Sequence, residues 1–426
     1  MSGPSYLPRI VDRELSDLLA QLPAIALEGA KGVGKTRTAQ RLAGAVFEFA
    51  SLGVAQNAAA GPTVIRDAKP PVLIDEWQRA PWIWDEVRQW ADQGAEPGRF
   101  ILTGSAVPVS APIHSGAGRI VPLRMRPLSL AERDLCEATV SLGDLLVGAT
   151  GRVDSRADVG LARYIEEITA SGLPAIRPLR GRARQRALDG YLQALVTREF
   201  PEQGHLVRKP DSLMAWLRAY ALATGSTASY AAILDAATPG DGDKPSKAAT
   251  LAYRDTLASL WMLDDVPAWN PVFSGLRTPL ASAPKHFLAD PGLAARLLRL
   301  TPDTLVAGSS LRPAGPQAGS LLGRLFEALV ALGLKTYAGA NDADLFHLRT
   351  ANGDREVDFV IERGTDIVAV EVKLSQSVDA RDVRHLNWLA GQLPDRHVEK
   401  VVITTGPQAV TRPDGVHVVP AALLGP

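Results

Sequence analysis

The segment Gly29–Thr36 constrains this chain more strongly than any other, because it reads Gly-Ala-Lys-Gly-Val-Gly-Lys-Thr. It fits the pattern G-x-x-x-x-G-K-[ST], in which glycines let backbone N–H groups surround phosphate oxygens at the start of a helix. An apolar run over 24–28 precedes the segment and a helical pattern over 35–45 follows it. We therefore predict a nucleotide-binding loop, with Lys35 on the β- and γ-phosphates of ATP and Thr36 on Mg²⁺.

An acidic pair, Asp75-Glu76, ends the apolar run 72–74. Ligands of open α/β sheets bind at the carboxyl ends of strands, so Asp75 is placed to hold Mg²⁺ and Glu76 to polarise the attacking water. Alone, such a pair is often a solvated turn, but its place after a phosphate loop favours catalysis. Thr103 ends the run 99–103 and either senses the γ-phosphate or only closes a strand. The residues expected to bind the nucleotide are Gly29, Ala30, Lys31, Gly32, Val33, Gly34, Lys35, Thr36, Asp75 and Thr103.

The arginines and tryptophans near these motifs each have two interpretations. Arginines follow the last predicted core strand at Arg119, Arg124 and Arg126. Arg119 is the first choice for an arginine that a neighbouring subunit supplies to the transition state, and a surface role is the alternative. Four tryptophans beside the acidic pair either stack on nucleic acid or, as we favour, pack a helix on the sheet. They are Trp77, Trp82, Trp84 and Trp90.

Composition removes several other classes of protein. The chain has 426 residues, which corresponds to two to four domains at roughly 100–200 residues each. Its only cysteine, Cys136, excludes an internal disulfide and a cysteine-based zinc cluster. Basic and acidic residues number 46 each, so no basic field of the whole molecule attracts nucleic acid. The mixed, charged N-terminus is not a signal peptide and no long apolar run occurs, so we expect a cytoplasmic location and no membrane partner.

The remaining chain separates into loop, helical and mixed regions. Residues 106–128 are rich in Pro, Gly and Ser and are predicted to be loop and turns. Helical patterns cover about 155–200, 211–223, 226–236 and 246–261, with a break at 239–245 and a strand candidate at 263–269. Residues 312–320 suggest a linker or an exposed loop before a helix over 321–334. The later strand candidates are 345–348, 356–362, 367–374 and 400–405, with a helix near 378–392.

Two of these strands, 356–362 and 367–374, flank a short turn and form a predicted hairpin. If Glu362 faces Ile367, the register of the whole hairpin follows. Two pairs then lie directly opposite each other: Asp358 with Glu371, and Glu356 with Lys373. Opposed residues have Cβ atoms roughly 4.5–5.5 Å apart, where two like charges destabilise a sheet unless something compensates them.

A divalent cation would compensate the opposed carboxylates of Asp358 and Glu371. Residues two apart share one face of a strand, so Lys373 lies on the same face and would stabilise developing charge or position a water. Glu327, on the preceding helix, would add a further carboxylate ligand. The alternative is a simple ion pair between Lys373 and Glu356 on a wet face.

Together these motifs resemble AAA-type ATPases with a C-terminal domain of unknown function 4143. The resemblance covers nearly the whole chain and is carried by the phosphate loop, 74–78 (IDEWQ), 102–106 (LTGSA) and 126–132 (RPLSLAE). In that family the C-terminal domain looks like the PD-(D/E)XK restriction-endonuclease fold. Asp358 then matches the first acid, Glu371 and Lys373 the E-x-K pair, and Glu327 the acid of the preceding helix. Val357 stands where that motif has proline.

The resemblance implies an α/β multidomain fold in four parts. These are a P-loop AAA-type ATPase core over 1–150, a helical lid over 151–205, a winged-helix-like module over 206–275 and a restriction-endonuclease-like α/β domain over 276–426. Winged-helix modules bind DNA in many proteins and contact proteins almost as readily. The family also implies a homo-oligomer, such as a ring or hexamer.

Three functional hypotheses result. The first is an Mg²⁺-dependent ATPase coupled to a nuclease-like domain that acts on DNA or RNA, with Mg²⁺ or Mn²⁺ at the C-terminal site. The second is an ATP-dependent switch or scaffold whose nuclease-like domain only binds nucleic acid or protein. The third, a DNA translocase or helicase, ranks last because the sequence carries no additional helicase motif.

Overall fold

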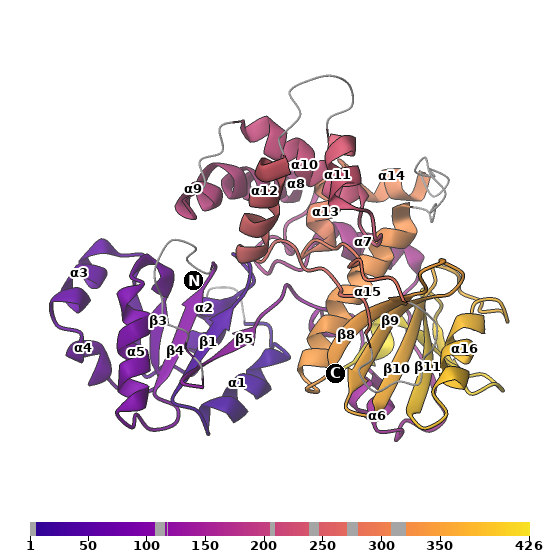
Figure 1. Cartoon of the computed structure of the whole chain (residues 1–426), viewed down its shortest axis with the longest axis horizontal. Coiled ribbons are helices and arrows are strands. Elements are labelled where there is room, and N and C mark those ends of the chain that lie inside the picture. Colours follow the sequence, from indigo (N-terminus) through magenta and orange to yellow (C-terminus); the bar gives the residue numbers. More distant parts are fainter. Residues whose placement is uncertain are drawn as a thin grey trace.

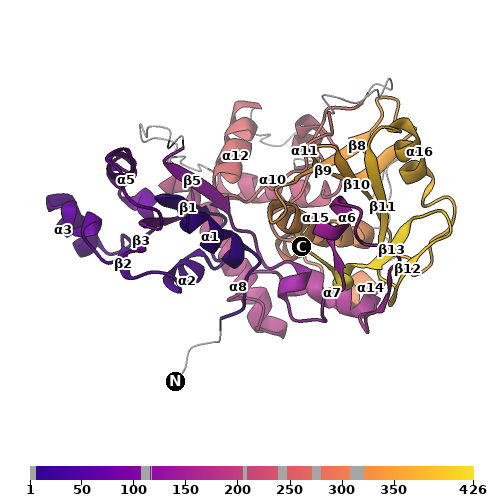
Figure 2. The ribbon, with the colours of Figure 1, turned by 90° about the horizontal axis from the view of Figure 1, so that it is seen from below.

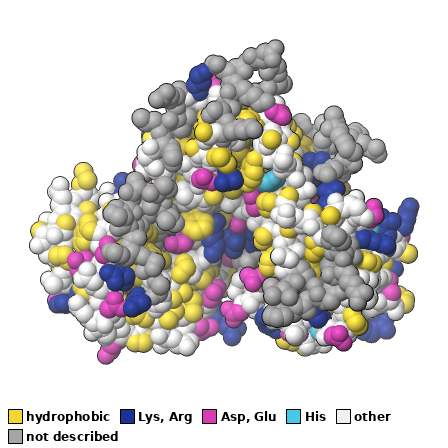
Figure 3. All heavy atoms as spheres, in the orientation of Figure 1, with side chains coloured by type: hydrophobic (Ala, Val, Ile, Leu, Met, Phe, Trp, Pro, Cys, Tyr) yellow, Lys and Arg dark blue, Asp and Glu magenta, His cyan; other side chains and the backbone are white. Residues whose placement is uncertain are grey.

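The computed structural model describes residues 6–106, 116, 118–204, 209–237, 247–270, 280–307 and 321–426. Figure 1 shows an N-terminal α/β part and a C-terminal α/β part side by side, with a mainly helical part above them. In Figure 2, which views the molecule from below, helix α8 (Gly181–Ala194) lies between the two sheets. Figure 3 shows Lys and Arg side chains gathered where the three parts meet on this face.

The N-terminal part is built on a five-stranded parallel sheet with the strand order β2-β3-β4-β1-β5. Its strands are β1 (Ala24–Glu28), β2 (Ala45–Glu48), β3 (Val72–Asp75), β4 (Phe100–Gly104) and β5 (Ile120–Arg124). Strands β3 and β4 are buried along their whole length, as expected for parallel strands covered on both faces. The helices of this part are α1 (Val11–Leu19), α2 (Lys35–Gln40), α3 (Leu52–Ala60), α4 (Thr63–Arg66) and α5 (Trp82–Asp92).

The predicted order of strand, loop and helix around the phosphate loop is confirmed, but two strands escaped the sequence analysis. The helix predicted over 35–45 ends at Gln40, and β2 begins at Ala45. Strand β5 lies within the segment predicted as loop, which also includes 107–115 and 117, outside the described residues. Proline argues against a strand in sequence analysis, so Pro122 made β5 look like a loop. Proline is tolerated there because β5 is an edge strand.

The four tryptophans pack, as the favoured interpretation predicted. Trp77 and Trp90 are buried between α5 and the sheet, and Trp90 stacks on Phe100 with ring centroids 5.3 Å apart. Trp82 and Trp84 are partly buried against the same cluster. Their rings therefore contribute to the core of the N-terminal part.

The helical part confirms the three helices predicted after residue 210, as α10 (Pro210–Leu222), α11 (Tyr230–Ala237) and α12 (Lys247–Ser259). Before them come α7 (Leu161–Ala170), α8 (Gly181–Ala194), the π-helix η3 (Leu195–Glu199) and α9 (Phe200–Glu202), and after them α13 (Pro291–Leu297) and α14 (Pro302–Ala307). The strand predicted over 263–269 is not continuous: it forms isolated bridges from Leu263 to Leu288, from Val266 to Lys285 and from Ala268 to His347. The predicted break over 239–245 and linker over 312–320 lie outside the described residues.

The C-terminal part holds a seven-stranded mixed sheet with the order β7-β12-β13-β11-β10-β9-β8, in which β7 is Asp154–Arg156. Its later strands are β8 (Asp344–Arg349), β9 (Glu356–Arg363), β10 (Asp366–Val372), β11 (His397–Thr404), β12 (Gln408–Thr411) and β13 (His417–Pro420). Helices α15 (Leu321–Gly339) and α16 (Arg384–Gln392) pack on this sheet. Among the helices of the described ranges, none is long and apolar enough to cross a membrane.

Residues 140–156 pair with or pack on the C-terminal part, although the predicted boundaries placed them in the core and the lid. Strand β7 (Asp154–Arg156) pairs with β12, and β6 (Val140–Ser141) pairs with β14 (Leu424–Gly425). The short helix α6 (Leu142–Leu146) lies against β10. Such pairing between distant segments leaves no local pattern in the sequence.

Candidate functional site

The phosphate loop connects β1 to α2 and can be built only with glycine at two of its positions. A Cβ atom on Gly29 would lie 2.1 Å from the carbonyl oxygen of Met125, which follows β5. Gly34, at the start of α2, has a φ of 107°, a conformation that other residues rarely adopt. The glycines of the motif therefore serve both the turn of the loop and its close approach to β5.

Lys35 is buried and turns back on the loop. Its Nζ donates hydrogen bonds to the carbonyl oxygens of Gly29 at 2.7 Å and of Ala30 at 3.0 Å. Burial lowers the pKa of Lys35 to about 8, although the nearby Glu76 carboxylate favours the charged form. The ammonium group thus lies among neutral acceptors, where an anion would stabilise it.

Three oxygen-bearing side chains converge at the carboxyl edge of the sheet. The Asp75 carboxylate accepts hydrogen bonds from the Thr36 hydroxyl at 2.7 Å and from the Thr103 hydroxyl at 2.5 Å. Thr103 on β4 is paired with Asp75 on β3 and with Leu27 on β1. This register places Thr103 and Asp75 at the same level of the sheet. Hydroxyl and carboxylate oxygens are the hard ligands that Mg²⁺ prefers, so these residues fit the predicted ion.

Glu76 follows Asp75 in a left-handed backbone conformation with a φ of 56°. Its carboxylate accepts a hydrogen bond from Gln78 Nε2 at 2.5 Å and a longer one from Ser105 Oγ at 3.4 Å. These contacts hold the carboxylate beside the strand ends, close enough to Lys35 to affect its pKa. The structure thus brings Glu76 to the edge of the sheet that carries the phosphate loop.

Arg119 does not lie at this edge. Ile120 pairs with Ala24 at the opposite, amino end of β1, and Arg119 forms an ion pair of 2.7 Å with Asp92. The arginine at the loop edge is Arg124, which pairs with Glu28. Burial lowers the pKa of Arg124 to about 10, and one of its terminal nitrogens is buried without a hydrogen-bond partner. An action of Arg119 on its own chain's site is excluded, and its role in trans stays a prediction.

The helical part touches the phosphate loop directly. Lys31 forms an ion pair of 2.5 Å with Glu199 of η3, and its carbonyl oxygen accepts a hydrogen bond from the Tyr191 hydroxyl at 3.0 Å. Arg79, just after the acidic pair, lies 3.8 Å from Glu202 of α9. The nucleotide-binding edge and the helical part therefore share charged contacts at two motifs.

A second connection runs through residues 261–266, which we name the junction segment. The guanidinium of Arg124 lies 3.7 Å from the ring centroid of Trp261, a cation–π contact. Arg126 donates a hydrogen bond of 2.9 Å to Asp264, which also lies 3.4 Å from Lys335 on α15. Burial opposes the charge of Asp264, but these cations hold its pKa well below the usual range. The junction segment thus links β5 to the C-terminal part.

The predicted C-terminal hairpin is confirmed in its register. Glu362 pairs with Ile367, and the pairing continues to Phe359 with Val370, which makes Asp358 and Glu371 the next positions. Asp358 accepts a hydrogen bond of 2.9 Å from the backbone N–H of Val372. Lys373 donates to Glu371 at 2.7 Å, so the alternative pairing of Lys373 with Glu356 is wrong.

A lysine that the sequence analysis missed neutralises this group of acids. Lys285 is 1% exposed, and its Nζ lies 2.8 Å from Glu327, 3.1 Å from Asp358 and 3.6 Å from Glu356. Burial opposes its charge, but the three carboxylates raise the pKa of Lys285 above its ordinary value. No sequence pattern places Lys285 beside these acids, because the contact depends on how the helical part packs on the sheet.

The predicted metal ligands Glu327, Asp358 and Glu371 are therefore not arranged around an ion. Within the described ranges, no group of three His, Cys, Asp or Glu residues is placed to hold a metal. Lys285 contacts the first two, and Gly225 closes over the first, since a Cβ on this glycine would lie 2.9 Å from Glu327 Oε2. The helical part covers the carboxylates with a cation of its own.

Two of these carboxyl groups are strongly perturbed. Burial, together with the charge of Asp358, raises the pKa of Glu371 to about 8, and Glu371 Oε2 is buried without a hydrogen-bond partner. Burial also raises the pKa of Glu327 to about 7, although Lys285 works in the opposite direction. The raised pKa values of Glu371 and Glu327 therefore favour their protonated, neutral forms at this end of the sheet.

Three family models match three separate regions of this chain. Residues 21–133 match the model of an AAA domain, and residues 322–424 match the domain of unknown function 4143. Residues 161–304, which include most of the helical part, match a further domain of unknown function, 8612.

Two curated relatives are uncharacterised proteins of Mycobacterium tuberculosis and Mycobacterium bovis. Each is 26% identical over 367 residues, which cover 83% of this chain and 71% of the relative. Similar solved structures are a Walker-type ATPase of Pyrococcus abyssi, with a TM-score of 0.39 over 67% of this chain and 94% of that one, and the ORC2 protein of Aeropyrum pernix, with 0.31 over 77% and 98%. Both are 16% identical to this chain.

The family matches agree with the geometry described above. The AAA domain contains the phosphate loop, the acidic pair and Thr103, and the C-terminal match contains Glu327, the hairpin and its charged residues. The chain therefore contains a region that matches an AAA domain and, further along, a region that matches the domain of unknown function 4143.

Proposed function

We propose that this chain is an Mg²⁺-dependent ATPase that works as a nucleotide-dependent switch, and that its nuclease-like C-terminal domain binds nucleic acid or protein without cleaving it. The contact of Lys285 with three carboxylates carries the choice of a switch over a nuclease. The enclosed ammonium group compensates the negative charge of these carboxylates. In a nuclease, a metal ion would do so.

The ATPase half of the proposal rests on the residues at the sheet edge. Lys35 would exchange its bonds to the loop carbonyls for the β- and γ-phosphates, and Thr36 and Asp75 would hold Mg²⁺. The ion would supply charge neutralisation for the phosphates. Glu76, whose carboxylate accepts hydrogen bonds from Gln78 and Ser105, would orient and polarise a water for attack on the γ-phosphate.

The switch half rests on the two charged connections out of this site. A triphosphate would attract Lys31 and Arg124, which contact Glu199 and Trp261 respectively. The junction segment continues from Trp261 to Val266, whose backbone bridges Lys285. Nucleotide binding can thus shift the junction segment, through contacts that continue to the C-terminal carboxylates.

The test is whether ATP changes the conformation of the chain without any cleavage activity. We expect ATP with Mg²⁺ to change the protease sensitivity of the wild type, Lys35→Ala to abolish that change, and Asp358→Ala to preserve it. Plasmid and RNA should remain intact in Mg²⁺ or Mn²⁺. An Asp358-dependent cleavage of either substrate would overturn the switch.

A metal-dependent nuclease is the second candidate, and the opposed carboxylates Asp358 and Glu371 with Lys373 beside them favour it. It would require Lys285 to leave the carboxylates before a metal ion binds. Cleavage that appears only with ATP, and that Asp358→Ala removes, would support this candidate.

We further propose that the working form is a homo-oligomer in which Arg119 reaches the site of a neighbouring subunit. The support is its position at the sheet edge opposite the phosphate loop, with its side chain half exposed. Mixing Arg119→Ala subunits with Glu76→Gln subunits tests this, because only an arginine that acts in trans would restore hydrolysis in mixed assemblies.

A further inference from the structure

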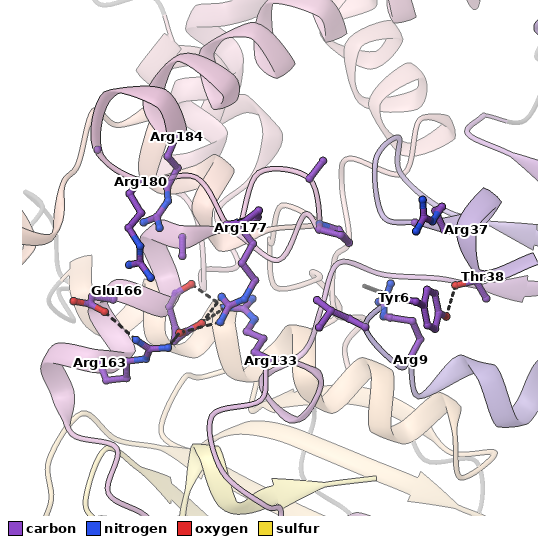
Figure 4. A pocket seen from close by; sticks show the side chains of 18 of the residues that line it. Tyr6, Arg9, Arg37, Thr38, Arg133, Arg163, Glu166, Arg177, Arg180 and Arg184 are labelled. Atoms are coloured by element: carbon purple, nitrogen blue, oxygen red, sulfur yellow. Dashed lines mark hydrogen bonds and ion pairs between the residues drawn. The ribbon is translucent and has the colours of Figure 1, made fainter. Parts of the chain in front are cut away.

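The cavity in Figure 4 belongs to the nucleotide site, because it begins beside Gly34 of the phosphate loop and Thr38 of α2. A different cavity of about 560 Å³, which we name the helical pocket, is lined by residues of α8, η3, α10 and α13. These helices lie together in the helical part (Figure 1). The lining of the helical pocket includes no residue of the phosphate loop or of the sheet edge. The pocket is large enough for a small organic ligand.

The helical pocket combines buried apolar residues with exposed charged ones. Leu192 of α8, Val196 of η3 and Leu297 of α13 line it and are buried. Arg218 of α10 and Arg299, just after α13, line it and are exposed. A ligand would therefore meet apolar surface inside the pocket and guanidinium groups at its entrance.

The charges of the lining leave two arginines for a ligand. Asp189 accepts hydrogen bonds of 2.6 and 2.7 Å from Arg296, and this pairing holds the pKa of Asp189 below its usual value. Asp211 lies in the first turn of α10, where the helix dipole stabilises a negative charge. The side chains of Arg218 and Arg299 form no hydrogen bond or ion pair with any residue in the described part of the chain. An anion is therefore the partner that this entrance fits.

Arg299 occupies a backbone position that helices usually give to glycine. It follows α13 in a left-handed conformation with a φ of 57°. Its N–H donates to the carbonyl oxygen of Arg296 at 2.9 Å, and the N–H of Leu300 donates to that of Ala295 at 2.9 Å. This is the hydrogen-bond pattern of a Schellman motif, in which glycine is the usual left-handed residue. Arginine is strained there, so the turn alone does not account for its presence.

The helices of the pocket also contact the phosphate loop. Tyr191, next to Leu192 in α8, donates a hydrogen bond of 3.0 Å to the carbonyl oxygen of Lys31. Glu199, which follows Val196 in η3, forms an ion pair of 2.5 Å with the Lys31 side chain. A ligand that packs on Leu192 and Val196 would therefore shift the helical segment that holds the loop.

We propose that the helical pocket binds a small anion with an apolar body, and that this ligand regulates the nucleotide site through α8 and η3. The head group is a carboxylate or a phosphate, since guanidinium groups bind both with pairs of hydrogen bonds. Binding of the anion is independent of the proposed function. Its regulatory effect rests on that function, because it requires ATP at the phosphate loop.

The binding experiment is calorimetry of the nucleotide-free chain with octanoate and with octyl phosphate, which share an apolar body and differ in the head group. The control ligands are 1-octanol, which lacks the charge, and acetate, which lacks the body. We expect octanoate or octyl phosphate to bind at least about tenfold more tightly than either control. The tighter of the two identifies the head group. Failure of both to bind, or equal binding of 1-octanol, would overturn the site.

The test variant is Arg299→Gly, because glycine removes the guanidinium group and suits the left-handed turn. We expect it to weaken binding of the anion about tenfold without lowering the melting temperature. The matched control is Arg182→Gln, because Arg182 is an exposed arginine of α8 that does not line the pocket. It should weaken binding less than about twofold. Equal weakening by the two variants would contradict the assigned role of Arg299.

Regulation is measured as the affinity for a fluorescent ATP analogue with and without the tighter of the two anions. We expect the anion to change this affinity about fivefold. Glu199→Gln should still bind the anion but lose this change, because it weakens the contact with Lys31. An unchanged affinity in the wild type would refute the regulatory effect. A chain that binds the anion but not the analogue would refute the proposed function and leave the pocket standing.

Discussion

The N-terminal loop and the C-terminal sheet each bring a buried lysine to carboxylates at a strand end, but the two lysines have different partners. Lys35 donates to two backbone carbonyls, and burial lowers its pKa to about 8. Lys285 lies among three carboxylates, which raise its pKa despite complete burial. The first lysine gains an anionic partner only from a ligand, whereas the second has its partners within the chain. Similar residue types therefore predict a ligand site in one part and an internal ion pair in the other.

The largest effect should come from the N-terminal lysine. Lys35→Ala removes the cation expected on the β- and γ-phosphates, so we expect ATP binding to fall at least about a hundredfold. Glu76→Gln should keep binding and lower the hydrolysis rate by about 10²–10³-fold, because it removes the carboxylate that polarises water. Calorimetry for binding and phosphate release for hydrolysis separate the two. Equal losses of binding in both variants would contradict these roles.

Lys285→Met should damage stability instead of ATP binding. The change leaves Glu327 and Asp358 buried without their cation, and removal of one partner from a buried ion pair typically costs about 3–5 kcal/mol. Denaturant unfolding measures the free energy. Lys373→Met is the matched control, and it should cost less because Lys373 is more exposed and contacts a single carboxylate closely.

A comparison of the wild type with Lys285→Met also tests whether these carboxylates can bind a metal ion. Without nucleotide, Mn²⁺ should not raise the melting temperature of the wild type, because Lys285 already compensates the carboxylates. In Lys285→Met, Mn²⁺ should raise it, since the freed carboxylate oxygens suit a divalent ion. If Mn²⁺ alone stabilises the wild type, the C-terminal carboxylates form a ligand site like the N-terminal one. The contrast between a ligand site and an internal ion pair would then be lost.

The path between the two sites gives a smaller prediction. Trp261→Ala removes the ring that Arg124 contacts, so ATP should still bind but its effect on the C-terminal part should shrink by about 1–3 kcal/mol of coupling. Hydrogen exchange of residues 280–288 with and without ATP measures this effect. Trp388→Ala, which removes a longer Arg355–tryptophan contact elsewhere, should leave the ATP response unchanged.

The sequence predicted the N-terminal site in detail because that site is local. Loop, strand and helix follow one another at Gly29–Thr36, and Asp75 and Thr103 end strands whose parallel order aligns them. It also predicted the hairpin register, because a tight turn fixes which residues oppose each other. These are the parts of the molecule in which short-range pattern determines position.

Long-range packing accounts for what the sequence did not predict. Lys285 reaches Glu327 across 42 positions of the chain, and Arg126 reaches Asp264 across 138. Strand β7 joins a sheet whose other members lie far downstream. No periodicity records such contacts, so the sequence suggested a metal ion where the fold supplies a lysine.

The pH dependence of ATP binding should separate the two lysines further. The pKa of free Lys35 is about 8, whereas bound phosphate would keep it charged. The affinity for ATP should therefore be nearly constant below pH 8 and fall above it, by at most tenfold per pH unit. Titration of a fluorescent ATP analogue between pH 6.5 and 9.5 checks this. An affinity that stays constant up to pH 9.5 would show that Lys35 remains charged without a ligand.

The smallest expected effect concerns Glu371, whose folded pKa of about 8 exceeds its ordinary value of 4.5. Between these values the folded chain holds a proton that the unfolded chain has lost, so this group makes stability fall as pH rises. Glu371→Gln removes that dependence and should stabilise the protein more at pH 9 than at pH 5. Glu166→Gln, which removes an exposed carboxylate, is the control for unfolding curves at both pH values. If Glu371→Gln has the same effect at both, Glu371 is ionised in the folded protein, and the C-terminal site then carries an anion that is free to bind a metal.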